Sequence, residues 1–145
     1  MPEIGLPAWM VWALLSAVFA ALTAIFAKVG VAGIDPDLAT FIRTVVILLV
    51  LGGILGLRGR MEPLTGISAR TYAFLALSGL ATGASWVCYF RALQLGDAAR
   101  VAPVDKLSVV LVALFGVLFL SEQLALQHWL GVLMITAGVV LMAMP

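Results

Sequence analysis

Three charged residues, Arg43, Asp105 and Lys106, lie inside stretches that are otherwise apolar. If those stretches are helices that cross a membrane, Arg43 lies about 9 Å beyond Asp37 along its helix. Asp105 and Lys106 lie about 12 to 13 Å beyond Asp97. An ionisable group in hydrocarbon costs about 2.5 to 3.5 kcal/mol, so each needs a partner, a water path or a route to the surface. We interpret Arg43 and Lys106 as groups that attract an anionic or carboxylate-bearing solute in a cavity, and Asp105 as a candidate proton or cation site.

A purely structural interpretation of these charges is also open. Asp105 could form an ion pair with Arg43 or Lys28 that locks three helices together, because buried charges are usually paired. Neighbouring residues on a helix point about 100° apart, so we expect Asp105 and Lys106 each to have a partner of its own. A binding site and an ion pair can coexist.

A second set of candidate site residues lies nearer the helix ends. Lys28 and Arg91 could contact a solute, or their long side chains could reach the lipid headgroups and act as anchors. Trp86, Tyr89 and Phe90 could line a cavity, or they could belong to the belt of aromatic residues that marks the membrane surface.

Two further residues suggest mechanical or structural roles. Pro103 could let its helix bend during a conformational change, or could hold a fixed kink. Glu122 lies near the start of the last apolar stretch, where a capping or helix-dipole role suits it. The chain has a single cysteine, Cys88, and a single histidine, His128. We therefore expect no metal site, no cofactor and no enzymatic residue set.

The composition indicates whether these residues are surrounded by water or by lipid. The 145 residues are 64% hydrophobic and 10% charged, with a mean hydropathy of +1.21. Soluble domains carry roughly 25% charged residues, so too few charges remain here to cover a water-facing globule. We predict an integral membrane protein in contact with the lipid bilayer. A net charge of +1 without a basic cluster argues against a nucleic-acid partner.

Turn-forming and charged residues divide the chain into five apolar segments. A membrane helix needs roughly 20 apolar residues. We predict a single all-α transmembrane domain over residues 1–145, a bundle of five helices, with the first segment retained rather than cleaved as a signal peptide. Ser68 is the expected N-cap of the third helix. The expected helices span residues 9–29, 38–57, 69–94, 98–120 and 126–144.

The charges at the helix ends bear on orientation and on subunit number. The turn-rich connection at residues 62–66 lies on the same face as the N-terminus. Of the cations outside the deep segments, Arg58, Arg60 and Arg70 lie on that face, and Lys28, Arg91 and Arg100 on the other. Because lysine and arginine counts set orientation, this balance favours a chain that inserts both ways and pairs as an antiparallel homodimer. A fixed orientation set by other features is the alternative.

Several sequence motifs resemble one known family. The most telling are GDAARVAPVDKLS at residues 96–108, LFLSEQL at 118–124, WLG at 129–131 and AGV at 137–139. Supporting motifs are AKVG at 27–30, DPDLAT at 35–40, RT at 43–44 and WVCYFRAL at 86–93. Together they resemble the EamA-type domain of the drug/metabolite transporter superfamily, in its single-domain five-helix bacterial and archaeal form.

The resemblance covers nearly the whole chain and implies half of a ten-helix inverted-repeat transporter in a prokaryotic plasma (inner) membrane. It implies a small-molecule substrate, alternating access as a homodimer, and coupling to protons with export favoured. The alternatives are a non-transporting membrane scaffold and a lipid-linked sugar flippase subunit that needs a partner chain. One departure matters, because four-helix small multidrug resistance relatives carry a glutamate in their first helix. Here that helix offers only Ser16 and Thr23 before Lys28.

Overall fold

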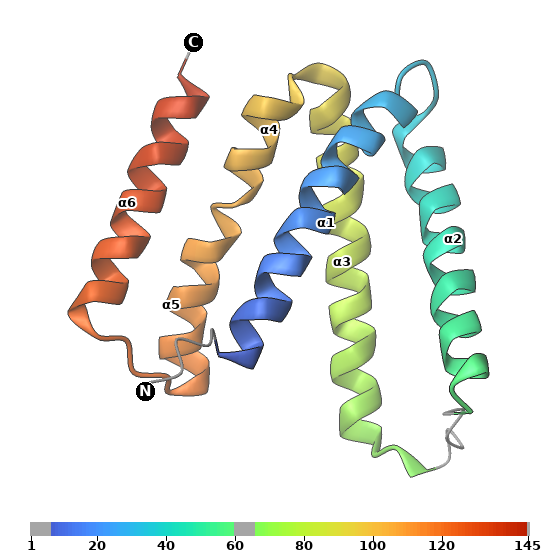
Figure 1. Ribbon diagram of the computed structural model, residues 1–145, viewed down its shortest axis with the longest axis horizontal. Helices are drawn as coiled ribbons and strands as arrows, with labels where there is room; N and C mark the ends of the chain where they lie inside the picture. Colours follow the sequence, from blue (N-terminus) through green and yellow to red (C-terminus); the bar gives the residue numbers. More distant parts are fainter. Residues whose placement is uncertain (1–6, 60–65, 145) are drawn as a thin grey trace, which may run out of the picture. The chain divides into compact units, whose positions relative to one another are not determined.

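A computed structural model of the chain describes residues 7–59 and 66–144. The described residues form helices and no strand, and five helical segments are long and apolar enough to cross a membrane. The predicted all-α membrane fold with five spanning helices is confirmed (Figure 1). Arg60 and most of the turn-rich connection after it lie outside the described residues.

The helices begin and end close to the expected positions. They are α1 (Ala8–Gly30), α2 (Pro36–Leu57), α3 (Ala69–Leu95), α4 (Ala98–Asp105), α5 (Ser108–Leu120) and α6 (Leu126–Ala143). No bound differs from the expected ranges by more than two residues. The difference lies inside the fourth segment, because the expected helix over residues 98–120 is divided into α4 and α5.

Capping groups account for where α2 and α3 begin. The Asp35 carboxylate accepts hydrogen bonds from the backbone N–H groups of Asp37 and Leu38 at 2.9 and 3.0 Å. Pro36 follows at the first helical position, where its missing N–H costs nothing. The Ser68 hydroxyl accepts from the Thr71 N–H at 3.1 Å, so the predicted N-cap of α3 is confirmed.

The division between α4 and α5 falls at Lys106 and Leu107. The Lys106 N–H donates to the carbonyls of Ala102 and Pro103, at 3.3 and 3.0 Å. The Leu107 N–H donates to the Val104 carbonyl at 3.0 Å. Bonds that span three residues tighten the chain and interrupt the regular four-residue ladder. The interruption therefore begins three residues beyond Pro103, at Lys106 and directly after Asp105.

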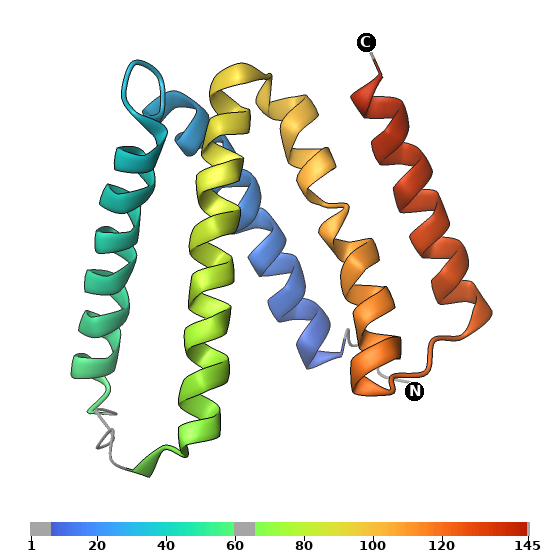
Figure 2. The ribbon, with the colours of Figure 1, turned by 180° about the vertical axis from the view of Figure 1, so that it is seen from behind.

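The described chain forms two compact units. In the unit over residues 29–95, α2 packs against α3, and both views of the ribbon show them side by side and running in opposite directions (Figures 1 and 2). The other unit contains α1 up to Lys28 together with α4, α5 and α6, and α6 packs against both α4 and α5. Most large apolar side chains are exposed, as expected for helices that face lipid.

Candidate functional site

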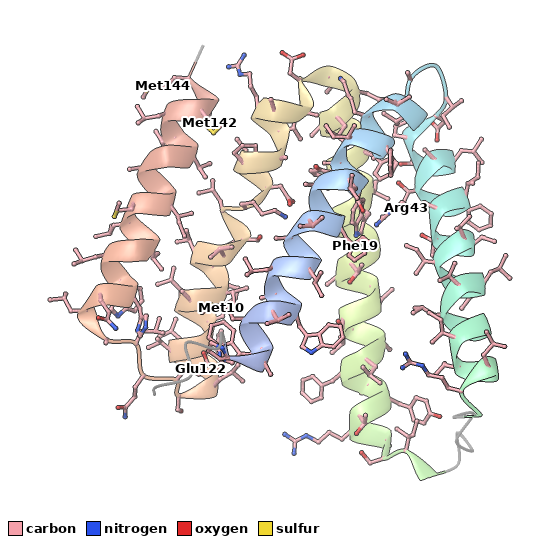
Figure 3. All side chains as sticks on the ribbon, viewed as in Figure 1. Met10, Phe19, Arg43, Glu122, Met142 and Met144 are labelled. Carbon is pink, nitrogen blue, oxygen red and sulfur yellow. The ribbon has the colours of Figure 1, made fainter. Side chains whose placement is uncertain are left out.

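The α2–α3 pair brings Arg43 onto an aromatic ring. The guanidinium carbon of Arg43 lies 3.3 Å from the centroid of the Trp86 ring and 5.9 Å from that of Phe90. Figure 3 shows Arg43 on α2 pointing toward α3. A cation over a tryptophan face is attracted by the ring quadrupole, by roughly 2 kcal/mol when water is excluded. The deep positive charge is thus stabilised by an aromatic ring from the neighbouring helix.

Two further rings hold Trp86 in place. Its ring meets Tyr89 edge-on at 5.5 Å and 82°, and Phe90 at 5.8 Å and 61°. Phe90 is only 3% exposed, whereas Trp86 and Tyr89 are half-buried. Spacings of three and four residues place all three rings on one face of α3. We call Trp86, Tyr89 and Phe90 the aromatic cluster.

Arg43 uses the face of its guanidinium in this arrangement, and not its N–H edge. Within the described part of residues 29–95, no oxygen accepts a hydrogen bond from Arg43. The threonine hydroxyls nearest on α2 are engaged by their own helix. Thr40 donates to the Pro36 carbonyl and Thr44 to the Thr40 carbonyl, both at 2.8 Å.

Arg91 lies nearer the helix end and has an acidic partner. Its guanidinium donates to the Asp37 carboxylate at 2.9 Å, and both side chains are more than half exposed, at 59% and 51%. One turn further along α3, the Gln94 amide donates to the carbonyls of Val31 and Ile34 at 3.1 and 2.7 Å. Sequence reasoning missed Asp37 and Gln94, although a short loop between α1 and α2 brings such end positions close to the end of α3.

Asp105 and Lys106 lie in the unit that contains α4, α5 and α6, and they pair with each other. The Lys106 ammonium lies 3.2 Å from the Asp105 carboxylate, where α4 ends and α5 has not yet begun. This differs from the expectation that each has its own partner. The long lysine stem reaches back to the carboxylate of its neighbour, although the two residues leave the backbone in different directions.

Lys28 and Arg100 reach backbone carbonyls in the same unit. The Lys28 ammonium donates to the Gly96 carbonyl at 2.8 Å. Arg100 donates to the carbonyls of Ala143 and Met144, at 3.2 and 3.0 Å, and so caps the end of α6. An ion pair of Asp105 with Arg43 stays a prediction, because those two residues belong to different units.

The structure thus brings some of the predicted residues close together, in two separate groups. Arg43, Trp86 and Tyr89 come together on α2 and α3, and Asp105, Lys106 and Pro103 lie together around the interruption in the fourth span. Among the described residues, no three histidine, cysteine, aspartate or glutamate side chains are grouped so that they could hold a metal ion. The charged side chains gathered here can bind and release charged groups.

Comparison with known proteins places the chain in a family. The model of the EamA-like transporter family matches residues 7–144. An "Uncharacterized transporter in cobO 3'region" of Sinorhizobium sp is 66% identical over 135 residues, which are 93% of this chain and 96% of that protein.

More distant similarity extends to flippase subunits. The "Probable 4-amino-4-deoxy-L-arabinose-phosphoundecaprenol flippase subunit ArnE" of Yersinia pestis (strain Pestoides F) is 34% identical over 73 residues, which are 50% of this chain and 64% of that protein. Its counterpart in Yersinia pseudotuberculosis serotype O:1b gives the same figures. No solved structure matches the chain. The five spanning helices and the family match make this a multi-pass protein of the bacterial inner membrane, and the chain belongs to the EamA-like transporter family.

Proposed function

We propose that the chain is a secondary transporter that moves a small organic solute by alternating access. The observation that carries this proposal is the interruption of the 23-residue span Ala98–Leu120 at Lys106, beside Asp105. Interrupted membrane helices expose backbone groups, which transporters use to build solute and ion sites near the middle of the bilayer.

Asp105 is the proposed proton site. Its carboxylate lies 3.2 Å from the Lys106 ammonium, so protonation of the carboxylate removes the charge that holds the lysine. Proton binding would then free Lys106 and alter the interrupted segment between α4 and α5. Export is the proposed direction, because the resemblance to the EamA-type domain favours it.

The proposed functional unit is an antiparallel homodimer. A five-helix chain corresponds to one half of an inverted-repeat transporter, and two copies in opposite orientations would rebuild the pathway. The even division of lysine and arginine between the two faces supports insertion both ways. Reporter fusions to the C-terminus test this: activity on both sides of the membrane is expected, and activity on one side only contradicts dual topology.

Flux by purified protein in proteoliposomes tests the transport proposal. Amino acids, organic anions, organic cations and sugar phosphates are offered with and without a proton gradient. We expect gradient-driven flux of at least one class, lost in Asp105→Asn and Lys106→Gln but kept in Asp97→Asn. The last variant is the matched control, because Asp97 carries the same charge at the start of α4, away from the interruption. Absence of flux in inserted dimers for every class would contradict transport by the chain alone.

The similarity to ArnE favours a second candidate, a flippase subunit for a lipid-linked sugar that needs a partner chain. A charged thiol reagent tests both candidates against a sealed, non-transporting scaffold. Cysteines are placed at positions 43, 105 and 106 after Cys88 is replaced. Reaction at these positions is expected for a water-accessible pathway, and protection at all three is expected for a scaffold. Flux that appears only with a partner chain would favour the flippase subunit.

A further inference from the structure

We infer that Arg43 binds an oxyanion of the transported solute, a carboxylate or a phosphate, and that Trp86 is the residue that positions it. The inference rests on the proposed transport function and narrows it to a substrate class. It assigns the anion to Arg43 alone, because Lys106 already has the Asp105 carboxylate at 3.2 Å.

The stacking geometry determines which part of Arg43 is available. With the guanidinium carbon 3.3 Å from the Trp86 centroid, the ring covers one face of the planar group. The five N–H donors of a guanidinium lie in its plane and point outward from its rim. A ring on the face therefore leaves the donor edge usable. Two N–H groups on that edge are spaced to donate to two oxygens of one carboxylate or phosphate. An ammonium group has no such pair of parallel donors.

The aromatic cluster makes this edge a fixed feature. Trp86 meets Tyr89 and Phe90 edge-on, and Phe90 is almost fully buried. A ring held from two sides has little freedom to turn, so the guanidinium stacked on it keeps one orientation before an anion arrives. Preorganised donors bind more tightly, because less conformational entropy is lost on binding.

The lack of an acceptor for Arg43 among the described residues of this unit also favours binding of an anion. A desolvated cation is costly without an acceptor, and none of the described oxygens in residues 29–95 accepts from Arg43. The nearest acidic group on α2, Asp37, is engaged by Arg91 at 2.9 Å. Cation–π attraction offsets only part of the desolvation cost. An incoming oxyanion would complete the missing hydrogen bonds.

Direct binding tests this inference separately from transport. Equilibrium dialysis of the full chain in lipid nanodiscs uses radiolabelled benzoate and phenylphosphonate, with benzamide as the neutral match in shape. We expect saturable binding of at least one anion and none of benzamide. Tighter binding of benzoate would assign a carboxylate, and tighter binding of phenylphosphonate a phosphate.

The variants test separately the positive charge of Arg43, its paired N–H donors and its positioning by Trp86. Arg43→Gln is expected to abolish saturable binding, and Arg43→Lys to weaken it about tenfold, because it keeps the charge and loses the paired donors. Trp86→Leu is expected to weaken binding about as much, and Trp86→Phe to restore most of it. Arg58→Gln, a change of an arginine just beyond the far end of α2, is expected to bind as the unmodified chain does.

Three outcomes would overturn the inference. They are unchanged binding in Arg43→Gln, binding of benzamide as tight as that of benzoate, and binding that appears only in Asp105→Asn. The last would mean that Asp105 already occupies the Arg43 edge. Size-exclusion profiles of Arg43→Lys and Trp86→Phe show whether the changed chains remain folded. Anion binding without flux would support this inference while contradicting transport by the chain alone.

Discussion

The Glu122 carboxylate fills the space beside Gly116 that a side chain would need. A Cβ at position 116 would lie 2.6 Å from the Glu122 Oε2 and 3.3 Å from its Cδ. The backbone brings the two together, because Ser121 adopts a left-handed conformation with φ 56° and the Glu122 N–H donates to the Gly116 carbonyl at 3.1 Å. The left-handed Ser121 ends α5 and returns the chain over the last turn of that helix.

We predict that Gly116→Ala displaces the Glu122 side chain. The displaced atoms are the end of a flexible side chain, so the loss in unfolding free energy should stay within about 1 kcal/mol. The measurement is thermal or denaturant unfolding in detergent, followed by tryptophan fluorescence.

A double-mutant cycle separates this contact from general effects at position 116. In a Glu122→Ala chain, Gly116→Ala is expected to be neutral or stabilising, since alanine is favoured over glycine inside a helix by about 1 kcal/mol. The same cost in both backgrounds would contradict the contact.

His128 is predicted to stabilise the start of α6. Its Nδ1 accepts a hydrogen bond from the Ala125 N–H at 3.1 Å, as the third helical residue does in a capping box. His128→Ala should lower the unfolding free energy by about 1 kcal/mol, whereas His128→Gln should retain most of it. Unfolding of both variants checks this, with Gln127→Ala as the neighbouring control. Equal losses in His128→Ala and His128→Gln would contradict a capping role.

The membrane spans could be predicted from the sequence because a run of about 20 apolar residues is a local property. Ser68 begins α3 through a contact with a residue three positions later, so this N-cap could also be predicted from the sequence. The interruption at Lys106 could not be placed this way. Pro103 removes one N–H and favours a bend nearby, but the tighter hydrogen bonds form three residues later.

The candidate site was predictable as residue types and not as contacts. Arg43 stands out because cations are rare in apolar helices. Trp86 and Tyr89 stand out because aromatic residues near a helix end can line a cavity or mark the membrane surface. That Arg43 lies on Trp86 depends on how α2 and α3 are aligned along each other, which single-helix patterns do not determine. The pairing of Asp105 with Lys106 escaped prediction because side-chain directions on a helix do not show how far a flexible lysine stem can reach back.

Arg100 is predicted to hold the last turn of α6. It donates to the carbonyls of Ala143 and Met144, which have no partner further along the helix. Arg100→Gln should remove about 1 kcal/mol of local stability and speed hydrogen exchange in that turn by roughly fivefold. Arg100→Lys should retain part of the protection, because a cation at a helix C-terminus is favourable. Unchanged exchange in Arg100→Gln would show that the cap is not needed.

Pro103 is predicted to limit the stability of α4 and to allow its movement. Proline has no N–H, so the carbonyl one turn earlier, that of Ala99, cannot receive the usual intrahelical bond. Pro103→Ala restores a donor and should raise the unfolding free energy by up to about 3 kcal/mol.

If the fourth span bends during alternating access, the added bond should also slow flux in proteoliposomes severalfold. Val104→Ala is the matched control, because it changes a side chain in the same turn and leaves the backbone donors intact. Raised stability with unchanged flux would assign Pro103 to a fixed kink, since a stiffer α4 would then have no effect on the rate-limiting movement.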